Sequence, residues 1–319
     1  MLRVNGFLDL DHYFKKIMDK NDYEFCDLAY EGYIIESLYA KGHYWLNIEN
    51  EFYYFKNTND IYEELIVGEC AKTLGIDALS YDLAIFKGVE GVISKSYQKE
   101  DAEYISGEDL LYDYLIDDKN IAYLESMGYD REKLKEYFLR LDLSDSINTL
   151  EVIWQAIEQH YKDKKISINV SEIMKKFASI FCFNVLIAQT DATPLNWELE
   201  ESKDGVKLCP FYDGSATLND KDMYPRPLMS MSVNFNDKNK NNYYKLEEFF
   251  KVSSNDFIEM FLEMFDKLDT YQFIDIMNKV EIKIERKMPA FTRRRILASF
   301  IENRDSIESV INKYKRGRI

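Results

Sequence analysis

Residues 183–215 read FNVLIAQTDATPLNWELEESKDGVKLCPFYDGS, and this stretch carries most of the information about the fold. An apolar run ends just before Asp191, Asn196 follows after four intervening residues, and Asp213 begins an Asp-Gly pair. The apolar run predicts a buried helix, and the Pro and Gly residues after it predict loops around a strand at 206–212. The sequence therefore places two acids and one amide on loops that follow a core helix.

These three side chains form a set that suits phosphoryl transfer. One acid orients the attacking hydroxyl, while an amide oxygen and a second acid hold magnesium, which neutralises charge on the transferring phosphate. Taken alone, an Asp followed by an Asn is typical of a capped loop, because turns are rich in both residues. The Asp-Gly pair, the apolar helix before it and a lysine in the N-terminal part favour the catalytic interpretation.

The N-terminal part alternates short strands with tight turns. Residues 44–56, YWLNIENEFYYFK, predict two aromatic-rich strands around a turn at Glu49–Asn50. Asp82–Phe86 and Gly91–Tyr97 predict two more strands, separated by a turn at Lys87–Gly88. A helix between the two pairs gives the order strand, strand, helix, strand, strand.

That helix begins after Asp60, with Glu63 three residues later as the partner in a capping box, and Gly75 ends it. Because Glu63 has this structural task, Glu64 is the residue we expect to pair with Lys56 at the end of the preceding strand. A strand lysine paired with a helix glutamate is how protein kinases hold the α- and β-phosphates of ATP. Considered without the motifs in the second part of the chain, Lys56 could equally be an ordinary solvated lysine at a strand end.

After about residue 105 the pattern becomes helical. Periodic apolar positions predict helices over Gly107–Ile116, Leu150–Tyr161, Val170–Ala188 and from Leu246 to the end. The polar stretch 234–242 predicts an exposed loop. We therefore predict an α+β, two-lobed fold, with a small β-rich lobe over residues 1–100 and a larger helical lobe over 101–319. Functional loops are expected where the lobes meet.

Composition narrows the class of protein. The 319 residues are 46% hydrophobic and 31% charged, which is enough apolar material for an ordered core. The four cysteines are scattered without a C-x-x-C pair, so we expect reduced thiols and no zinc site. The first residues lack the features of a signal peptide, and the longest apolar run, Phe177–Ala188, is too short to span a bilayer. A cytoplasmic protein without a membrane partner is expected.

Charge is distributed unevenly along the chain. The chain has 57 Asp and Glu against 41 Lys and Arg, which gives a net charge of −16. An acidic surface repels the phosphate backbone, so nucleic acid is not expected to be a partner of the molecule as a whole. From residue 281 onward the chain carries 11 Lys and Arg against 5 Asp and Glu. This basic segment could bind RNA, but such a run is more often a solvated helix face followed by a basic tail. On an otherwise acidic chain, it could also pair with acids of the same chain.

Several of these segments resemble one family. Phe183–Glu200 and Val206–Ser215 resemble the catalytic loop and metal-binding segment of the HipA-like serine/threonine protein kinases, including the CtkA-type branch. Glu51–Ile76, with its lysine strand and acidic helix, resembles the first lobe of that family. Gly91–Tyr97 followed by Ile105–Leu111 resembles the strand and hinge that join the lobes.

The resemblance implies an ATP- and Mg2+-dependent kinase that phosphorylates Ser or Thr of a protein substrate. By this resemblance, Asp191 is the catalytic acid, Asn196 and Asp213 are metal ligands, Lys56 fixed by Glu64 binds phosphate, and the main chain of Lys95 to Tyr97 binds adenine. Kinases of this family can act as toxins held by a DNA-binding antitoxin, so an antitoxin protein is an expected class of partner.

The chain departs from the family pattern after the catalytic acid. Ala192 and Thr193 stand where the family usually places Arg and His, and only residues 40–43 (AKGH) mark the phosphate-binding turn. The loss of Arg and His favours a nucleotide-binding pseudokinase or interaction module, whereas the retained Lys56, Asp191, Asn196 and Asp213 oppose it. A further alternative is an enzyme of the same fold that transfers AMP instead of phosphate.

Overall fold

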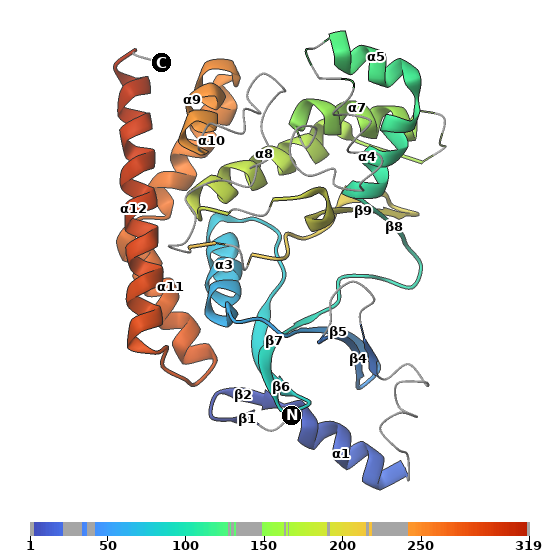
Figure 1. The fold of residues 1–319 in the computed structure, drawn as a ribbon, viewed down its shortest axis with the longest axis vertical. Coiled ribbons are helices and arrows are strands. Elements are labelled where there is room, and N and C mark those ends of the chain that lie inside the picture. Colours follow the sequence, from blue (N-terminus) through green and yellow to red (C-terminus); the bar gives the residue numbers. More distant parts are fainter. Residues whose placement is uncertain are drawn as a thin grey trace.

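A seven-stranded sheet forms most of the N-terminal part of the molecule in the computed structural model (Figure 1). The structure describes residues 3–21, 34–36, 42–126, 128, 131, 149–162, 164, 166–189, 192–214, 217–218 and 242–317. The strands are β1 (Arg3–Val4), β2 (Phe7–Asp9), β3 (Ile34–Glu36), β4 (His43–Ile48), β5 (Glu51–Lys56), β6 (Tyr81–Phe86) and β7 (Val89–Lys95). They lie in the order β1-β2-β6-β7-β5-β4-β3, and every pairing is antiparallel except that of β2 with β6.

Two tight turns set the register of the central strands. Glu49 and Asn50 both have positive φ, 55° and 64°, and join β4 to β5. Lys87 and Gly88, with φ of 51° and 71°, join β6 to β7 in the same way. Positive φ at both central residues suits the right-handed twist of the paired strands. Both turns are therefore confirmed, although the last strand begins at Val89 and ends at Lys95, two residues earlier at each end than its predicted bounds.

Helices cover both faces of the sheet. Successive side chains on a strand point to opposite faces. Ala84 and Ile93 accordingly pack with Leu10 of α1 (Leu10–Asn21), whereas Leu83 and Val92 join the main core with α3 (Ile61–Leu74). Strand β5 lies between β4 and β7 in the middle of this layer, so its C-terminal residue is held on both sides.

The predicted capping box at the start of α3 is wrong. The Asp60 side chain makes no capping hydrogen bond, and the Glu63 side chain turns instead to Arg295, 232 residues later in the chain. A buried carboxylate is stabilised more by a guanidinium than by a backbone amide, because the ion pair offsets its charge. The predicted end of the helix is confirmed: Gly75, with φ of 80°, is the C-cap.

The C-terminal part is mainly helical, and a small three-stranded sheet adjoins it. The helices are α4 (Gly107–Ile116), α5 (Asp118–Ser126), α7 (Leu150–Tyr161), α8 (Val170–Leu186), the 3-10 turn η1 (Pro194–Asn196), α9 (Asn242–Val252), α10 (Asn255–Lys267), α11 (Thr270–Lys283) and α12 (Ala290–Lys315). Strand β9 (Glu198–Ser202) pairs antiparallel with β8 (Glu103–Ser106) and β10 (Gly205–Leu208). Helix α12 runs along one side of the molecule, from α9 and α10 down past α3 (Figure 1).

The strand predicted over 206–212 is shorter than expected, because the chain leaves the small sheet at Leu208. It then crosses to the N-terminal part, where the Phe211 N–H donates to the Asp77 carbonyl at 2.8 Å and the Leu79 N–H donates to the Phe211 carbonyl at 2.9 Å. This crossing carries Asp213 under α3.

Six of the eleven basic residues of the C-terminal segment form ion pairs with acids in the described part of the same chain, which is one of the uses considered for it. Its ion pairs are Lys283–Glu69, Arg286–Glu90, Lys287–Glu281, Arg293–Glu281, Arg295–Glu63 and Lys313–Glu247. Two of these pairs reach α3, so the segment braces the N-terminal part.

Some predictions concern cysteines, the polar loop and the membrane. Cys70, Cys182 and Cys209 are free thiols and buried, and Cys26 lies outside the described residues. Of the predicted loop 234–242, all but Asn242, the first residue of α9, lies outside them too. Within the described part of the chain, no helix is both long enough and apolar enough to cross a bilayer.

Candidate functional site

Lys56 is the centre of the candidate site. It ends β5, and its ammonium lies 2.6 Å from Glu64 Oε1 and 2.5 Å from Asp213 Oδ1. Burial disfavours the charged amine, but the carboxylates of Glu64 and Asp213 outweigh that effect and raise the pKa of Lys56. The lysine is therefore a permanent cation held between two acids that come from α3 and from the loop after β10.

Glu64 is fully buried in the first turn of α3. One carboxylate oxygen accepts from Lys56, and the other accepts from the Gly214 N–H at 3.0 Å. Burial raises the pKa of this carboxyl group, while the Lys56 ammonium opposes that shift. Both oxygens thus have donors, and Glu64 joins the lysine strand directly to the Asp-Gly loop.

The Asp213–Gly214 turn has a geometry that only a small residue permits. Asp213 has a φ of 57°, and a Cβ on Gly214 would stand 2.5 Å from Val67 Cγ1 of α3. The Asp213 N–H donates to the Tyr81 hydroxyl at 3.2 Å. The Asp213 side chain is 37% exposed, so its carboxylate is fixed by Lys56 on one side and accessible on the other.

The loop after α8 lies against this turn. Asn196 ends η1. The hydroxyl of Tyr212, which precedes Asp213, donates to the carbonyl of Leu195, which precedes Asn196, at 3.0 Å. The side-chain amide of Gln189 donates to the Asp213 carbonyl at 3.0 Å. The structure therefore brings the two predicted metal ligands onto adjoining loops. Asp191, the predicted catalytic acid, lies outside the described residues.

Trp197, directly after Asn196, is a buried packing residue that anchors this loop to α8. Its ring meets that of Phe177 of α8 edge to face at 4.9 Å, and it is buried. A Cβ on Gly107 would overlap the indole and would stand 2.5 Å from the Pro194 carbonyl oxygen. The close approach of α4 to the loop therefore depends on a glycine at the first position of that helix.

The predicted adenine-binding segment follows β7. Tyr97 donates to Glu198 Oε2 at 2.7 Å, and its ring stacks on Tyr212 at 6.0 Å between ring centroids. Lys95 is different, because its side chain pairs with Glu51 at the surface and does not reach Lys56 or Asp213 through any contact found among the described residues. The prediction for this segment concerned its main chain, so the Lys95 side chain is not required there.

The residues that suit a metal ion are Asn196 and Asp213. An amide oxygen and a carboxylate oxygen are hard donors, and magnesium is commonly held by one or two such groups together with phosphate oxygens. No cluster of three or more His, Cys, Asp or Glu side chains suited to a metal exists in the described part of the chain. A small donor set of this kind fits an ion that arrives with a nucleotide better than a resident structural metal.

Sequence reasoning missed Tyr81, Gln189 and Arg295, which support the site without belonging to its motifs. Tyr81 and Gln189 contact the backbone of Asp213, and Arg295 contacts Glu63 beside Glu64. No local pattern distinguishes these residues, because their partners lie 24 to 232 positions away. Only the apparent excess of basic residues after 281 hinted that a distant acid needed a partner.

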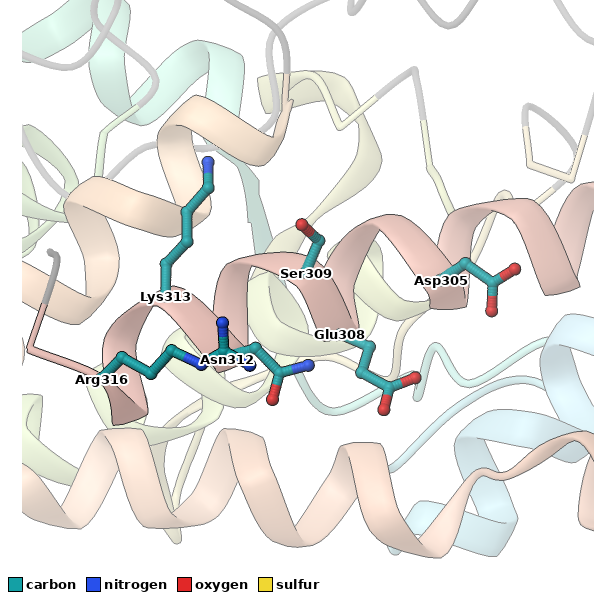
Figure 2. A pocket seen from close by; sticks show the side chains of 6 residues that line it. All are labelled: Asp305, Glu308, Ser309, Asn312, Lys313 and Arg316. Carbon is teal, nitrogen blue, oxygen red and sulfur yellow. The ribbon is translucent and has the colours of Figure 1, made fainter.

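Another hollow lies away from this site, on α12. It has a volume of about 510 Å³ and is lined by Asp305, Glu308, Ser309, Asn312, Lys313 and Arg316 (Figure 2). Acids and bases balance among these residues, and none of them contacts Lys56, Glu64 or Asp213. It is a surface depression along a polar helix face and not part of the candidate site.

In the site as a whole, a strand lysine pairs with a buried helix glutamate and faces an Asp-Gly loop from the mainly helical part. The solved structure of the proinflammatory kinase CtkA from Helicobacter pylori matches 88% of this chain and 96% of its own, with a TM-score of 0.61 and 15% identity. HipA from Shewanella oneidensis MR-1, solved with HipB and operator DNA, matches 84% of this chain and 60% of its own, with a TM-score of 0.54 and 15% identity.

These likenesses show the fold and its α+β class. No protein-family model matches the chain, and no curated protein sequence matches it either. The chain therefore shares a fold with these two proteins at a sequence identity of only 15%.

Proposed function

We propose that this protein is an ATP- and Mg2+-dependent protein kinase that phosphorylates Ser or Thr. The observation that carries the proposal is the position of Lys56, whose ammonium contacts both Glu64 and Asp213. Asp213 lies 157 positions after Lys56 in the sequence, and it meets the Lys56–Glu64 pair in the folded chain. Protein kinases use a strand lysine, a helix glutamate and an Asp-Gly loop of this kind to hold nucleotide phosphates. The likeness to CtkA, which is a kinase, supports the same function.

In the proposed mechanism, each group has one task. Lys56, kept charged by its two acids, binds the phosphates of ATP. Asn196 and Asp213 hold magnesium, which supplies charge neutralisation at the transferring phosphate when it is bound. Asp191 orients the substrate hydroxyl and accepts its proton. The main chain after β7, from Lys95 to Tyr97, binds adenine at the boundary we place near residue 100, between lobes 1–100 and 101–319.

Asp213 has a second role before nucleotide binds. Its carboxylate accepts a hydrogen bond from the Lys56 ammonium, so a phosphate that binds Lys56 must share this donor or replace Asp213 as its acceptor. The Asp213 side chain is partly exposed, so solvent and a metal ion could reach it. Lys56 and the metal therefore carry most of the attraction for ATP on a protein with a net charge of −16.

The partner class follows from the same comparison. HipA was solved with HipB and operator DNA, and we propose a protein partner of the antitoxin kind for this chain as well. Six of the eleven basic residues from position 281 onward pair with acids among the described residues, and the whole chain has a net charge of −16. Contact of this protein itself with nucleic acid is for that reason not part of the proposal.

The decisive experiment compares the purified protein with Asp213→Ala and Lys56→Met. With [γ-32P]ATP and Mg2+, the wild type should label itself or a co-purified protein on Ser or Thr, and both variants should lose this labelling. Glu69→Gln, on the exposed side of α3, is the matched control and should keep it. Equal silence of the folded wild type and Asp213→Ala would refute the kinase proposal.

The second candidate is a nucleotide-binding pseudokinase. Ala192 and Thr193 favour it, because neither can supply the positive charge that helps to neutralise the γ-phosphate. Mg2+-dependent ATP binding without turnover would select this alternative. Mass spectrometry of a labelled product separates transfer of phosphate from transfer of AMP by the mass added.

A further inference from the structure

Helix α12 contacts three separate parts of the candidate site, although none of its residues belongs to a kinase motif. Arg295 reaches α3 through Glu63 and reaches the segment after Gly214 through the Leu218 carbonyl at 3.3 Å. Asn303, two turns further along α12, reaches the end of α8. These contacts lie on the side of α12 that faces the core.

The Arg295–Glu63 pair is next to the catalytic ion pair. Glu63 is 1% exposed and Glu64 is fully buried, so two adjacent carboxylates are removed from water on one helical turn. Burial raises the pKa of Glu63, and Arg295 opposes that shift by hydrogen bond and charge. Each buried carboxylate thus has one cation of its own: Lys56 for Glu64 and Arg295 for Glu63. The two pairs hold the first turn of α3 at two positions roughly 100° apart around the helix axis.

Arg295 also holds the metal-binding segment. Leu218 is fully buried, and Thr217 beside it donates its hydroxyl to the Gly214 carbonyl at 2.8 Å. The Gly214 N–H in turn donates to Glu64. The segment from Gly214 to Leu218 is therefore tied at one end to Glu64 and at the other to Arg295.

Asn303 holds the end of the helix that precedes the catalytic loop. Its amide donates to the carbonyls of Val185 at 3.0 Å and Leu186 at 2.9 Å, and the side chain is buried. The last carbonyls of a helix lack partners within it, so a buried helix end needs a donor from elsewhere. Asn303 supplies that donor five residues before Asp191.

We infer that α12 is a positioning element of the site, which acts through Arg295 and Asn303. It aligns the helix that carries Glu64, the turn that carries Asp213 and the end of α8. This inference rests on the proposed function where it concerns catalysis, and on geometry alone where it concerns the order of these segments. Loss of Arg295 should loosen two of these three parts, namely α3 and the segment that follows Gly214.

The test compares Arg295→Met with Arg304→Met on the full chain. Arg304 is also on α12 and also donates to two carbonyls, those of Phe265 at 2.6 Å and Leu268 at 2.8 Å, but these belong to α10 and its end. Hydrogen exchange read by mass spectrometry reports on each segment without requiring activity. Arg295→Met should speed exchange about fivefold or more in peptides from α3 and from residues 205–214, whereas Arg304→Met should do so only in α10.

Turnover gives the second readout. With Mg2+ and ATP, Arg295→Met should lower kcat about tenfold, Arg304→Met should stay within about threefold of the wild type, and Arg295→Lys should lie between. Equal exchange in α3 for the two Met variants overturns the inference, and so does equal turnover in an active protein. If the wild type neither binds nor consumes ATP, the proposed function fails, and the exchange comparison still decides the role of Arg295. Should Arg295→Met not fold, Arg295→Lys takes its place in both measurements.

Discussion

Replacing Glu64 by Gln isolates the value of its charge, because the two side chains have the same shape. The carboxylate accepts one hydrogen bond from Lys56 and one from the Gly214 N–H. A Gln amide has one acceptor oxygen and presents its NH2 group to the other donor, so one of these bonds is lost. A hydrogen bond to a charged group contributes about 1.5–3 kcal/mol, and a buried donor without a partner costs further free energy.

An opposing effect reduces this loss. Burial has raised the pKa of Glu64, so keeping it ionised costs free energy that Gln does not incur. Because Lys56 would still have Asp213, we expect a net loss of about 2 kcal/mol in the free energy of unfolding, equivalent to roughly 30-fold in the folding equilibrium. Urea unfolding followed by circular dichroism measures the free energy, and titration with Mg2+ and ATP measures nucleotide affinity.

The control is Glu69→Gln on the same helix. Glu69 pairs with Lys72 and Lys283 at the surface, so its loss should cost less than about 1 kcal/mol. We expect Glu64→Gln to weaken ATP binding about tenfold or more, and Glu69→Gln to leave it unchanged. If Glu64→Gln unfolds at the wild-type urea midpoint and binds ATP with wild-type affinity, the central place given to the Lys56–Glu64 pair is refuted.

Two further predictions test other parts of the structure. Gly91→Ala would press a methyl group against the Lys56 carbonyl and strand β5, and should destabilise the fold by about 1–3 kcal/mol, seen as a lower urea midpoint. Glu281→Gln tests the connection between α11 and α12. Burial alone would raise the pKa of Glu281, but hydrogen bonds from Lys287 and the Met288 N–H outweigh burial, together with the charge of Arg293. The net effect is a pKa below its ordinary value. The ionised form is thus favoured in the folded state, so this variant should lose about 1–3 kcal/mol at pH 7, and its difference from the wild type should shrink as the pH falls below 4.5. A difference that persists unchanged at pH 3.5 would contradict the charge-based reasoning.

Local signals in the sequence were sufficient for the central strands. The turns at Glu49–Asn50 and Lys87–Gly88 contain residues that tolerate positive φ, and the aromatic strands around them follow from residue preferences alone. The end of α3 at Gly75 is equally local. Such features depend on neighbours a few positions away, so a single sequence contains the information needed to place them.

Features that depend on distant partners were missed or misassigned. No individual strand was predicted within residues 1–40, yet β1, β2 and β3 add three strands to the sheet, and β2 pairs in parallel with β6 far along the chain. Glu63 was assigned to a capping box because its competing partner, Arg295, is 232 positions away. The association of Lys56 with Glu64 was predicted from kinase chemistry, whereas the contact of Tyr81 with Asp213 had no sequence signal at all.

The separation between Glu63 and Arg295 also has a consequence for synthesis. At about 5–20 residues per second, the ribosome adds Arg295 roughly 10–50 s after Glu63. During that interval Glu63 lacks the guanidinium with which it pairs in the folded protein, so burial of its carboxylate costs more free energy. We therefore expect the helix that carries Glu64 to reach its final packing only after α12 has left the ribosome.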